Sequence, residues 1–317
     1  MYMDAIIGHT HLLSYFRHAK ERGVLGHAYM LVGPRHVGKQ TLAEIVSAEI
    51  LGVSKDALYR HPDVITVTRG VHEKTGKTKK FIDTDEIREL TSRLHEASFL
   101  GGHTIAIVDG AEDMNQGAAN AFLKTLEEPG QKTLLWLLVE DVSRVPATIR
   151  SRCQVFSMAP VPEDVLAEGL VKEGESPPRA KQLARESLGR PGRAILSQRE
   201  EETAEAWAKE AARFVSLFGT SFHEKIKAVE DLLEDTDDAT GNREALKDTL
   251  AIWQLALGDM ARATQGKPCR LIRTVPSTNL LSSQGQHIEK RIADADNWLS
   301  ANGHPRLLIE HILLAIP

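Results

Sequence analysis

Two glycines and a lysine, Gly33, Gly38 and Lys39, are spaced as in loops that bind nucleotide phosphates. They lie in the run GPRHVGKQ, which matches the pattern G-x-x-x-x-G-K and then departs from it. In a working phosphate loop the residue after the lysine is Ser or Thr, because its hydroxyl binds the Mg²⁺ that bridges the phosphates. Here that residue is Gln40, and His36 stands where many such loops carry a further glycine. The motif therefore predicts a phosphate loop that is impaired for hydrolysis.

ATP hydrolysis also needs an acid pair at the end of a neighbouring strand. The aspartate of this pair holds Mg²⁺ through water, and the following glutamate polarises the attacking water. Asp109 ends the apolar run TIAIVD and fits the first role, but the next residue is Gly110. Glu112 and Asp113 lie past the turn, so we expect them to point away from the site. The hydroxyl at position 40 and the carboxylate at position 110 are thus both missing. Two independent losses indicate an active site that no longer hydrolyses ATP.

The hydrophobic pattern predicts the elements that position these residues. Strand-like runs occur at 28–32, 63–68, 104–109, 133–139 and 154–157, and helical patterns occur at 4–23, after the phosphate loop, from Asp83 and from Asn115. Strands that alternate with helices predict a parallel α/β sheet covered on both faces. The nucleotide site is then expected at the carboxyl ends of the strands.

The character of the chain changes after Pro160, where strand-like runs stop. Short helical segments follow between Glu163 and Ser197, and beyond about residue 200 the pattern is entirely helical. Two apolar stripes with helical spacing indicate a bundle with one buried face, and their members are Trp207, Ala211, Phe214 and Phe218, then Leu246, Leu250, Trp253, Leu257 and Met260. We therefore predict a nucleotide-fold domain at 1–158, a three-helix lid at 159–200 and an all-helical domain at 201–317.

Composition excludes several classes of protein. The chain has 317 residues. Its net charge of −5 argues against a protein that binds DNA by itself. Its two cysteines, Cys153 and Cys269, are too few for a disulfide scaffold and fit a reducing cytoplasm. No cationic leader and no apolar run near 18 residues occur, so neither export nor a membrane span is expected. The basic run Arg69 to Lys80 predicts a solvated hairpin, with DNA contact as the alternative.

Several longer runs resemble the bacterial clamp-loader branch of the AAA+ ATPases, which serves DNA polymerase III. These runs are HAYMLVGPRHVGK, IRELTSRLHEASFLGGHTIAIVDGAEDMNQGAANAFLKTLEEPG, VPATIRSRCQVF and NGHPRLLIEHILL. The likeness extends from about Ile7 to the last residue, and the Ser-Arg-Cys motif at 151–153 is its most specific part. The length of the chain and its end after the helical collar resemble the delta-prime class, whereas the gamma/tau class would continue further or keep an intact phosphate loop.

The resemblance implies roles for individual residues. Arg152 matches the arginine finger that serves a neighbouring subunit's ATP, and the alternative is an ion pair with an acid of its own domain. Arg193, at a predicted helix start, matches the second sensor of the lid. The nucleotide-binding positions, expected to be vestigial, are Gly33, Gly38, Lys39, Gln40, Thr41, Asp109 and Arg193.

Other positions depart from the family's pattern. The segment Val139 to Val142 replaces a polar first sensor with two acids, which would repel a γ-phosphate. Relatives carry a four-cysteine zinc module, but no cysteine lies between residues 1 and 152, so no zinc is expected. His9 and His11 have poor metal spacing and are interpreted as surface residues. No cofactor is expected to be required, and weak ATP or ADP binding remains open.

The resemblance implies a cytoplasmic, non-catalytic subunit that helps load the sliding clamp onto primed DNA in replication. Its expected partners are the gamma/tau and delta subunits, the clamp and, within the complex, the DNA. One alternative is an active gamma-type ATPase in which Gln40 or Thr41 substitutes at the metal. Another is a stand-alone DNA-binding AAA+ module that uses the loop at 69–80.

Overall fold

The computed structural model describes residues 6–70, 79, 81–96, 98, 102–130, 132–199, 201–234, 241–267, 269–272, 282–300 and 303–317. The chain divides into two compact units, Met1–Ile195 and Leu196–Pro317. The predicted boundaries of three domains, after residues 158 and 200, stay a prediction.

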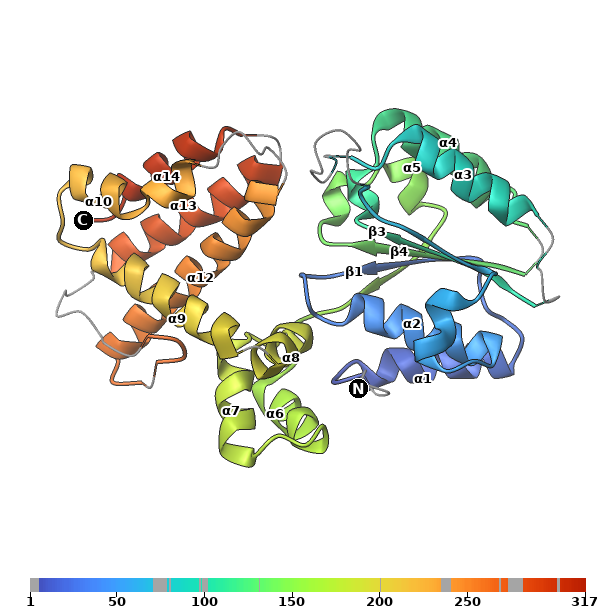
Figure 1. Cartoon of the computed structure of the whole chain (residues 1–317), viewed down its shortest axis with the longest axis horizontal. Helices are drawn as coiled ribbons and strands as arrows, with labels where there is room; N and C mark the ends of the chain where they lie inside the picture. The colour runs from blue at the N-terminus through green and yellow to red at the C-terminus, as the bar shows by residue number, and fades with distance from the viewer. Residues whose placement is uncertain are drawn as a thin grey trace. The chain divides into compact units, whose positions relative to one another are not determined.

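The first unit is built on a five-stranded parallel sheet (Figure 1). Its strands are β1 (Ala28–Val32), β2 (Val64–Val67), β3 (Thr104–Asp109), β4 (Thr133–Val139) and β5 (Gln154–Ser157). They are ordered β2-β3-β4-β1-β5, and every neighbouring pair is parallel. The central strands are continuous apolar runs because helices cover both of their faces. This sheet, with a phosphate loop after β1, confirms the predicted P-loop α/β fold class.

Helices cover the two faces of the sheet in separate groups, as Figure 1 shows. On one face lie α1 (Thr10–Glu21) and α2 (Lys39–Leu51), and on the other lie α3 (Thr84–His95), α4 (Gln116–Glu127) and the short α5 (Ala147–Arg150). Three 3₁₀ turns join these elements: η1 (Lys55–Arg60), η2 (Ala111–Asp113) and η3 (Val142–Arg144). Two predicted helix starts are confirmed, since Asp83 and Glu86 form a capping box and the Asn115 side chain accepts the Ala118 N–H at 2.8 Å.

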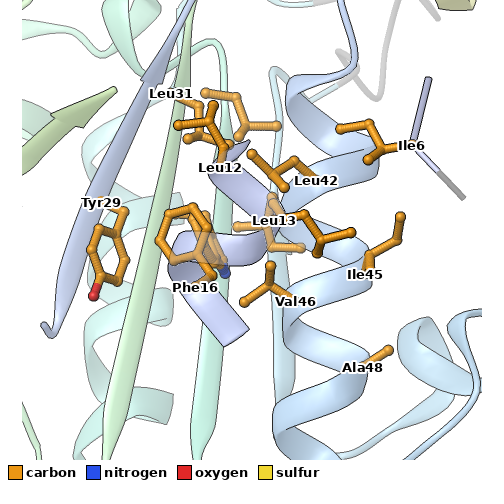
Figure 2. Close-up of a cluster of buried hydrophobic side chains, with 14 of the residues drawn as sticks. Ile6, Leu12, Leu13, Phe16, Tyr29, Leu31, Leu42, Ile45, Val46 and Ala48 are labelled. Atoms are coloured by element: carbon orange, nitrogen blue, oxygen red, sulfur yellow. The ribbon is translucent and has the colours of Figure 1, made fainter. Parts of the chain in front are cut away.

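An aromatic cluster fixes α1 and α2 against the sheet. The ring of Phe16 meets those of Tyr29 and Trp136 edge to face, at centroid distances of 4.9 and 5.0 Å. Figure 2 shows Phe16 beside Tyr29, with Leu42 of α2 directed into the same cluster. The indole N–H of Trp136 donates to the Ser47 hydroxyl at 3.0 Å, so this buried polar pair is satisfied. Helix α2, whose first residue is the phosphate-loop lysine, is therefore packed against β1 and β4.

The predicted helix at 4–23 was wrong at its start. Helix α1 begins only at Thr10, because Gly8 and His9 adopt left-handed conformations with φ of 75° and 52°. At Gly8 a Cβ atom would collide with the side chain of Val161, so the turn needs glycine both for its φ and for this close approach. The residues before the helix thereby pack against the segment that follows β5.

Three small helices follow: α6 (Glu163–Lys172), α7 (Pro177–Glu186) and α8 (Pro191–Arg199), the last of which runs past the end of the first unit at Ile195. They enclose a core of their own, whose members include Ile7, Val161, Leu166, Leu170, Leu183 and Ala194. Ile7 comes from the start of the chain, so these lid helices are tied to the segment that leads into α1.

The second unit is helical throughout its described residues, as predicted. Its helices are α9 (Glu201–Ser216), α10 (Phe222–Ala228), α11 (Glu230–Glu234), α12 (Gly241–Thr264), α13 (Ser282–Ser300) and α14 (Pro305–Leu313). The stripe on α12 is confirmed as core, with Leu246, Leu250, Trp253, Leu257 and Met260 all buried. On α9, Ala211, Phe214 and Phe218 are buried, while Trp207 is half-buried. In the described part of the chain, no helix has the length and apolar character that crossing a membrane requires.

A buried acid organises the segment after α12. The carboxylate of Asp259 accepts the backbone N–H groups of Arg270, Leu271 and Ile272 at 2.7, 2.5 and 3.0 Å. A buried charge is tolerated when hydrogen bonds satisfy it in this way. The hydrophobic pattern gives no sign of this anchor, because it depends on a loop that returns to the helix.

Candidate functional site

The phosphate loop joins β1 to α2 and keeps the shape that its motif predicts. The N–H of Gly33 donates to the Val139 carbonyl at 3.0 Å, and a Cβ at Gly33 would overlap the carbonyl oxygen of Met158. Gly38 has φ 109°, and His36 takes a left-handed φ of 62° that glycine would adopt more readily. The backbone therefore makes the turn despite the histidine.

The phosphate-binding lysine is engaged by its own loop. Lys39 is the first residue of α2, its side chain is buried, and Nζ donates to the carbonyls of Gly33 at 2.6 Å and Pro34 at 3.0 Å. Burial lowers the pKa of Lys39, and the negative charges of Glu140 and Glu112 oppose that shift. A phosphate would have to replace both carbonyls, so the loop satisfies its ammonium group without a ligand.

The position that should supply the metal hydroxyl belongs to a polar network. The amide Nε2 of Gln40 donates to Glu44 Oε1 at 2.9 Å and to the Tyr59 hydroxyl at 2.8 Å. Lys55 Nζ lies 3.0 Å from Glu44 Oε2, and the Tyr59 hydroxyl also donates to Glu44. Sequence reasoning missed Glu44, Tyr59 and Lys55, although the spacing of Gln40 and Glu44 by four residues was a signal of a helical pair.

The acid pair is incomplete, as the sequence indicated. Asp109 ends β3 beside β4, and its accessible carboxylate is partly desolvated by the surrounding protein, which raises the pKa of Asp109. Lys39 and Arg35 oppose that rise. Gly110, with φ 74°, has no side chain to polarise water. With the Gln40 amide engaged as well, the residues present do not fit the Mg²⁺ of a hydrolysing ATP site.

The expectation that Glu112 points away from the site was wrong. Glu112 is buried, its Oε1 accepts the Glu140 N–H at 2.8 Å, and its charge acts on Lys39. Its other oxygen, Oε2, has no hydrogen-bond partner among the described residues. Asp113 does point elsewhere, since it pairs with Arg144 at 2.6 Å. The backbone turn at Gly110 directs the first of these acids inward and the second outward.

Burial gives Glu112 a measurable effect on stability. It raises the pKa of Glu112 to about 7 from an ordinary 4.5, so between these values the folded chain binds more protons than the unfolded chain. The free energy of unfolding should therefore fall by about 3 kcal/mol as pH rises from 5 to 8. We expect Glu112→Gln, which stays neutral, to lose this part of the pH dependence and to be the more stable chain at pH 8.

Urea unfolding at pH 5 and pH 8, followed by circular dichroism, measures the difference. Asp85→Asn is the control, because it also removes one carboxylate, from a side chain that is 93% exposed. An equal fall with pH in the parent and in Glu112→Gln would contradict the assignment.

The lid helices contact the phosphate loop through α8. The N–H of Gly192 donates to the His36 carbonyl at 2.8 Å, and a Cβ at Gly192 would lie 3.2 Å from that oxygen. Arg193, the predicted second sensor, is the next residue and is buried in the first turn of α8. The structure thus brings Arg193 to the loop's side of the lid, and its role as a sensor stays a prediction.

The histidines near the start of the chain differ from each other. His11 is exposed, but His9 is half-buried, and its ring hydrogen-bonds the Val37 backbone of the phosphate loop. Burial, with the nearby His11, lowers the pKa of His9. Its interpretation as a surface residue was therefore wrong. Among the described residues, no group of three or more His, Cys, Asp or Glu side chains is placed to hold a metal ion.

The acidic first-sensor segment divides between two roles. Glu140 lies 3.5 Å from Arg35, and its charge also reaches Lys39. Asp141 instead accepts the Ser143 N–H at 2.9 Å and begins η3. Glu140 is therefore the acid of this segment that would repel a phosphate at Lys39.

Arg152 lies at the opposite end of the sheet from the phosphate loop. It lies two residues before the first residue of β5, which runs parallel to β1, whereas the loop follows the carboxyl end of β1. Strands of four or five residues separate the two ends by about 15 Å. The guanidinium Nη2 donates to Glu127 at 2.6 Å and Nη1 to the Thr148 carbonyl at 2.9 Å. Arg152 therefore cannot serve its own loop, and it pairs with an acid of its own domain.

Cys153, beside Arg152, packs against the core under α3, α4 and α5. Burial raises the pKa of its thiol to about 12, so the thiolate required of a nucleophile does not form near neutral pH. Cys153 is therefore a small packing residue rather than a nucleophile.

Most of the basic run, residues 71–78 and 80, lies outside the described residues, and so does the hairpin predicted there. Two basic residues at its ends are described. Lys79 lies 3.1 Å from Asp83 and 3.2 Å from Glu86, and Arg69 lies 3.5 Å from Asp113. Nearby acids thus offset both charges, which weakens the case for DNA contact at these two positions.

Comparison with known proteins relates this arrangement to a replication complex. Residues 8–162 match the family described as DNA polymerase III, delta subunit. The chain is 36% identical over 150 residues to DNA polymerase III subunit delta' of Pseudomonas aeruginosa, a match that covers 43% of this chain and 44% of that protein. It is 38% identical over 136 residues to the same subunit of Escherichia coli, covering 43% and 39%.

A longer match is to DNA polymerase III subunit tau of Bacillus subtilis, with 24% identity over 297 residues, 92% of this chain and 48% of that protein. In each of these relatives the match spans less than half of the relative's length. The N-terminal half of the chain is homologous to the DNA polymerase III delta' subunits, and the resemblance expected from the sequence is confirmed there.

Proposed function

We propose that this chain acts as a delta-prime-type subunit of a DNA polymerase III clamp loader and assists ATP-driven loading of the sliding clamp onto primed DNA. The observation that carries the proposal is the separation of Arg152 from its own phosphate loop by the length of the sheet. From that place, Arg152 would reach a nucleotide held by another subunit and not one in its own loop. Homology to delta' subunits at 36% and 38% identity supports the same role.

The contacts within the phosphate loop favour the proposal that this subunit does not hydrolyse ATP. Lys39 is satisfied by loop carbonyls, Gln40 by Glu44 and Tyr59, and Gly110 offers no carboxylate. The rival reading, a gamma-type ATPase, would need Gln40 or Thr41 to hold the metal. The Gln40 amide would first have to break its hydrogen bonds to Glu44 and Tyr59, which argues against a gamma-type ATPase.

The proposal includes the partners and the site roles implied by the resemblance. The chain would assemble with gamma/tau and delta subunits and would meet the clamp and primed DNA within that complex. Arg152 would be the arginine finger, and Gly33, Gly38, Lys39, Asp109 and Arg193 would be relics of a nucleotide site. No cofactor and no zinc would be required, and any ATP or ADP binding would be weak.

The proposal predicts that the isolated chain hydrolyses no ATP above background, with or without primed DNA. The metal hydroxyl and the water-polarising acid are both absent, and each normally contributes to the hydrolytic step. Phosphate release from the purified chain, compared with Lys39→Ala, is the measurement. Steady turnover that disappears in Lys39→Ala would show a working loop and would favour the gamma-type ATPase instead.

A further inference from the structure

The side chain of Arg152 is held at two points by its own domain. Its Nη2 donates to Glu127 Oε1 at 2.6 Å, and its Nη1 donates to the Thr148 carbonyl at 2.9 Å. Glu127 is the last residue of α4, and Thr148 lies in α5. The guanidinium therefore bridges the ends of two helices, and a long flexible side chain is confined to one orientation.

This arrangement leaves part of the guanidinium open. Arginine has five N–H donors in a planar fork. Glu127 and Thr148 each take one of them, and the Ser151 hydroxyl lies at a longer 3.4 Å from Nη1. Among the described residues, Nε has no hydrogen-bond partner, and the Arg152 side chain is 36% exposed. Donors thus remain on the side of the fork that its own domain does not use.

We infer that Glu127 is a positioning residue for the ATP hydrolysis that Arg152 assists in a neighbouring subunit. Glu127 fixes the plane of the guanidinium so that its unused donors face the neighbour's phosphate before that phosphate arrives. Preorganisation of this kind lowers the cost of ordering a side chain during the reaction. This inference rests on the proposed function, because it needs a neighbour whose nucleotide Arg152 can reach.

The expected size of the effect follows from the exposure of the pair. The side chains of Arg152 and Glu127 are 36% and 51% exposed, so water screens their attraction. Pairs of this kind shift equilibria by at most about fivefold. The attraction between Glu127 and Arg152 is therefore strong enough to bias the orientation of the guanidinium. It is also weak enough for a phosphate to take over one of the hydrogen bonds.

A surface ion pair without a role in the reaction is the competing explanation. The chain contains a matched example in Arg185 and Glu163, which lie 2.8 Å apart with side chains 47% and 45% exposed. This pair joins α7 to α6 and shares no residue with the Arg152–Glu127 pair. Glu163→Ala therefore removes a similar ion pair without touching the proposed finger.

The test uses the full chain in a complex reconstituted with the gamma/tau and delta subunits of its own host, the clamp and primed DNA. The partner ATPases carry inactive phosphate loops at every site except the one that faces this chain. The variants are Glu127→Ala, Glu127→Gln, Arg152→Ala, the double variant Glu127→Ala with Arg152→Ala, and Glu163→Ala. The kcat and KM for ATP are measured after size exclusion confirms an intact complex.

We expect Glu127→Ala to lower kcat by about two- to fivefold and to leave KM unchanged. Glu127→Gln, whose amide oxygen still accepts a hydrogen bond, should lie between Glu127→Ala and the parent, and Glu163→Ala should equal the parent. The double variant should be no slower than Arg152→Ala, because Glu127 acts only through Arg152.

Different results would separate the inference from the proposed function. Parent-like kcat in Glu127→Ala together with a slow Arg152→Ala would overturn the positioning role and leave the proposed function standing. A double variant slower than Arg152→Ala would also overturn it, since Glu127 would then act independently. Parent-like kcat in Arg152→Ala would overturn both. If Glu127→Ala fails to assemble, Glu127→Gln decides, and a parent-like kcat in that variant would overturn the positioning role.

Discussion

Replacing Arg152 by alanine is expected to slow ATP hydrolysis at the neighbouring subunit's site by about 10³-fold, with clamp loading falling as well. An arginine supplied from outside the nucleotide's own subunit stabilises charge that develops on the γ-phosphate, and its loss costs about 10³ to 10⁵ in rate. The complex should still assemble, because Arg152 is partly exposed and makes only local contacts with Glu127 and Thr148. DNA-stimulated hydrolysis and clamp loading by the reconstituted complex are the measurements.

The chemistry of the guanidinium supplies the control for this prediction. Arg152→Lys keeps the positive charge but loses the planar fork that matches phosphate oxygens, so it should restore little activity. Arg185→Ala removes an arginine of similar exposure from the lid and should leave hydrolysis unchanged. Normal hydrolysis and loading in a fully assembled Arg152→Ala complex would exclude the finger.

Assembly is expected to be lost when carboxylates are placed on an exposed apolar stripe of α14. Leu307 and Leu314 are 64% and 69% exposed and lie seven residues apart, on one face of the last helix and its C-cap. Trp298 is 54% exposed and stacks on His311, which lies between the two leucines. Apolar patches of this kind on a helical surface mark interaction sites, and aromatic anchors contribute most of their binding energy. The double variant Leu307→Asp with Leu314→Asp should abolish the complex.

Size exclusion with the partner subunits measures this loss. The substituted leucines are exposed, so the isolated variant should remain folded, which circular dichroism verifies. Val24→Asp is the control, because Val24 is 66% exposed in the first unit and lies outside the stripe. Deleting Glu201 to Pro317 should also abolish assembly, since a permanent attachment buries an obligate interface of about 2,000 Å² or more. Co-elution of the double variant with its partners would exclude α14 as the attachment surface.

The sequence predicted the sheet well because its signals are local. Strands β1, β3 and β4 are predominantly apolar runs of five to seven residues, and the capping residues Asp83 and Asn115 mark helix starts within three or four residues of chain. The start of α1 was not predictable in this way. The turn at Gly8 depends on Val161, more than 150 residues later, and periodicity carries no information about such a contact.

In the candidate site, too, only the features with local sequence signals could be predicted. The absence of a hydroxyl at Gln40 and of an acid at Gly110 could be read directly from the motif. The contacts that replace the lost chemistry could not, because Tyr59 reaches Gln40 from η1, and Glu112 turns inward only through the backbone at Gly110. The Arg152–Glu127 pair was foreseen only as an alternative, without its partner, since α4 and α5 meet through tertiary packing.

The hydrogen bond from Gly192 to His36 has a consequence for how this domain responds to the cell's energy supply. In a nucleotide-dependent domain, the ligand couples lid and loop, and mass action makes their arrangement follow ligand concentration. Here backbone atoms of the chain itself connect lid and loop, and this hydrogen bond forms without a bound nucleotide. On the proposed function, this subunit would be a constant reference against which the neighbouring ATPases change shape through each cycle.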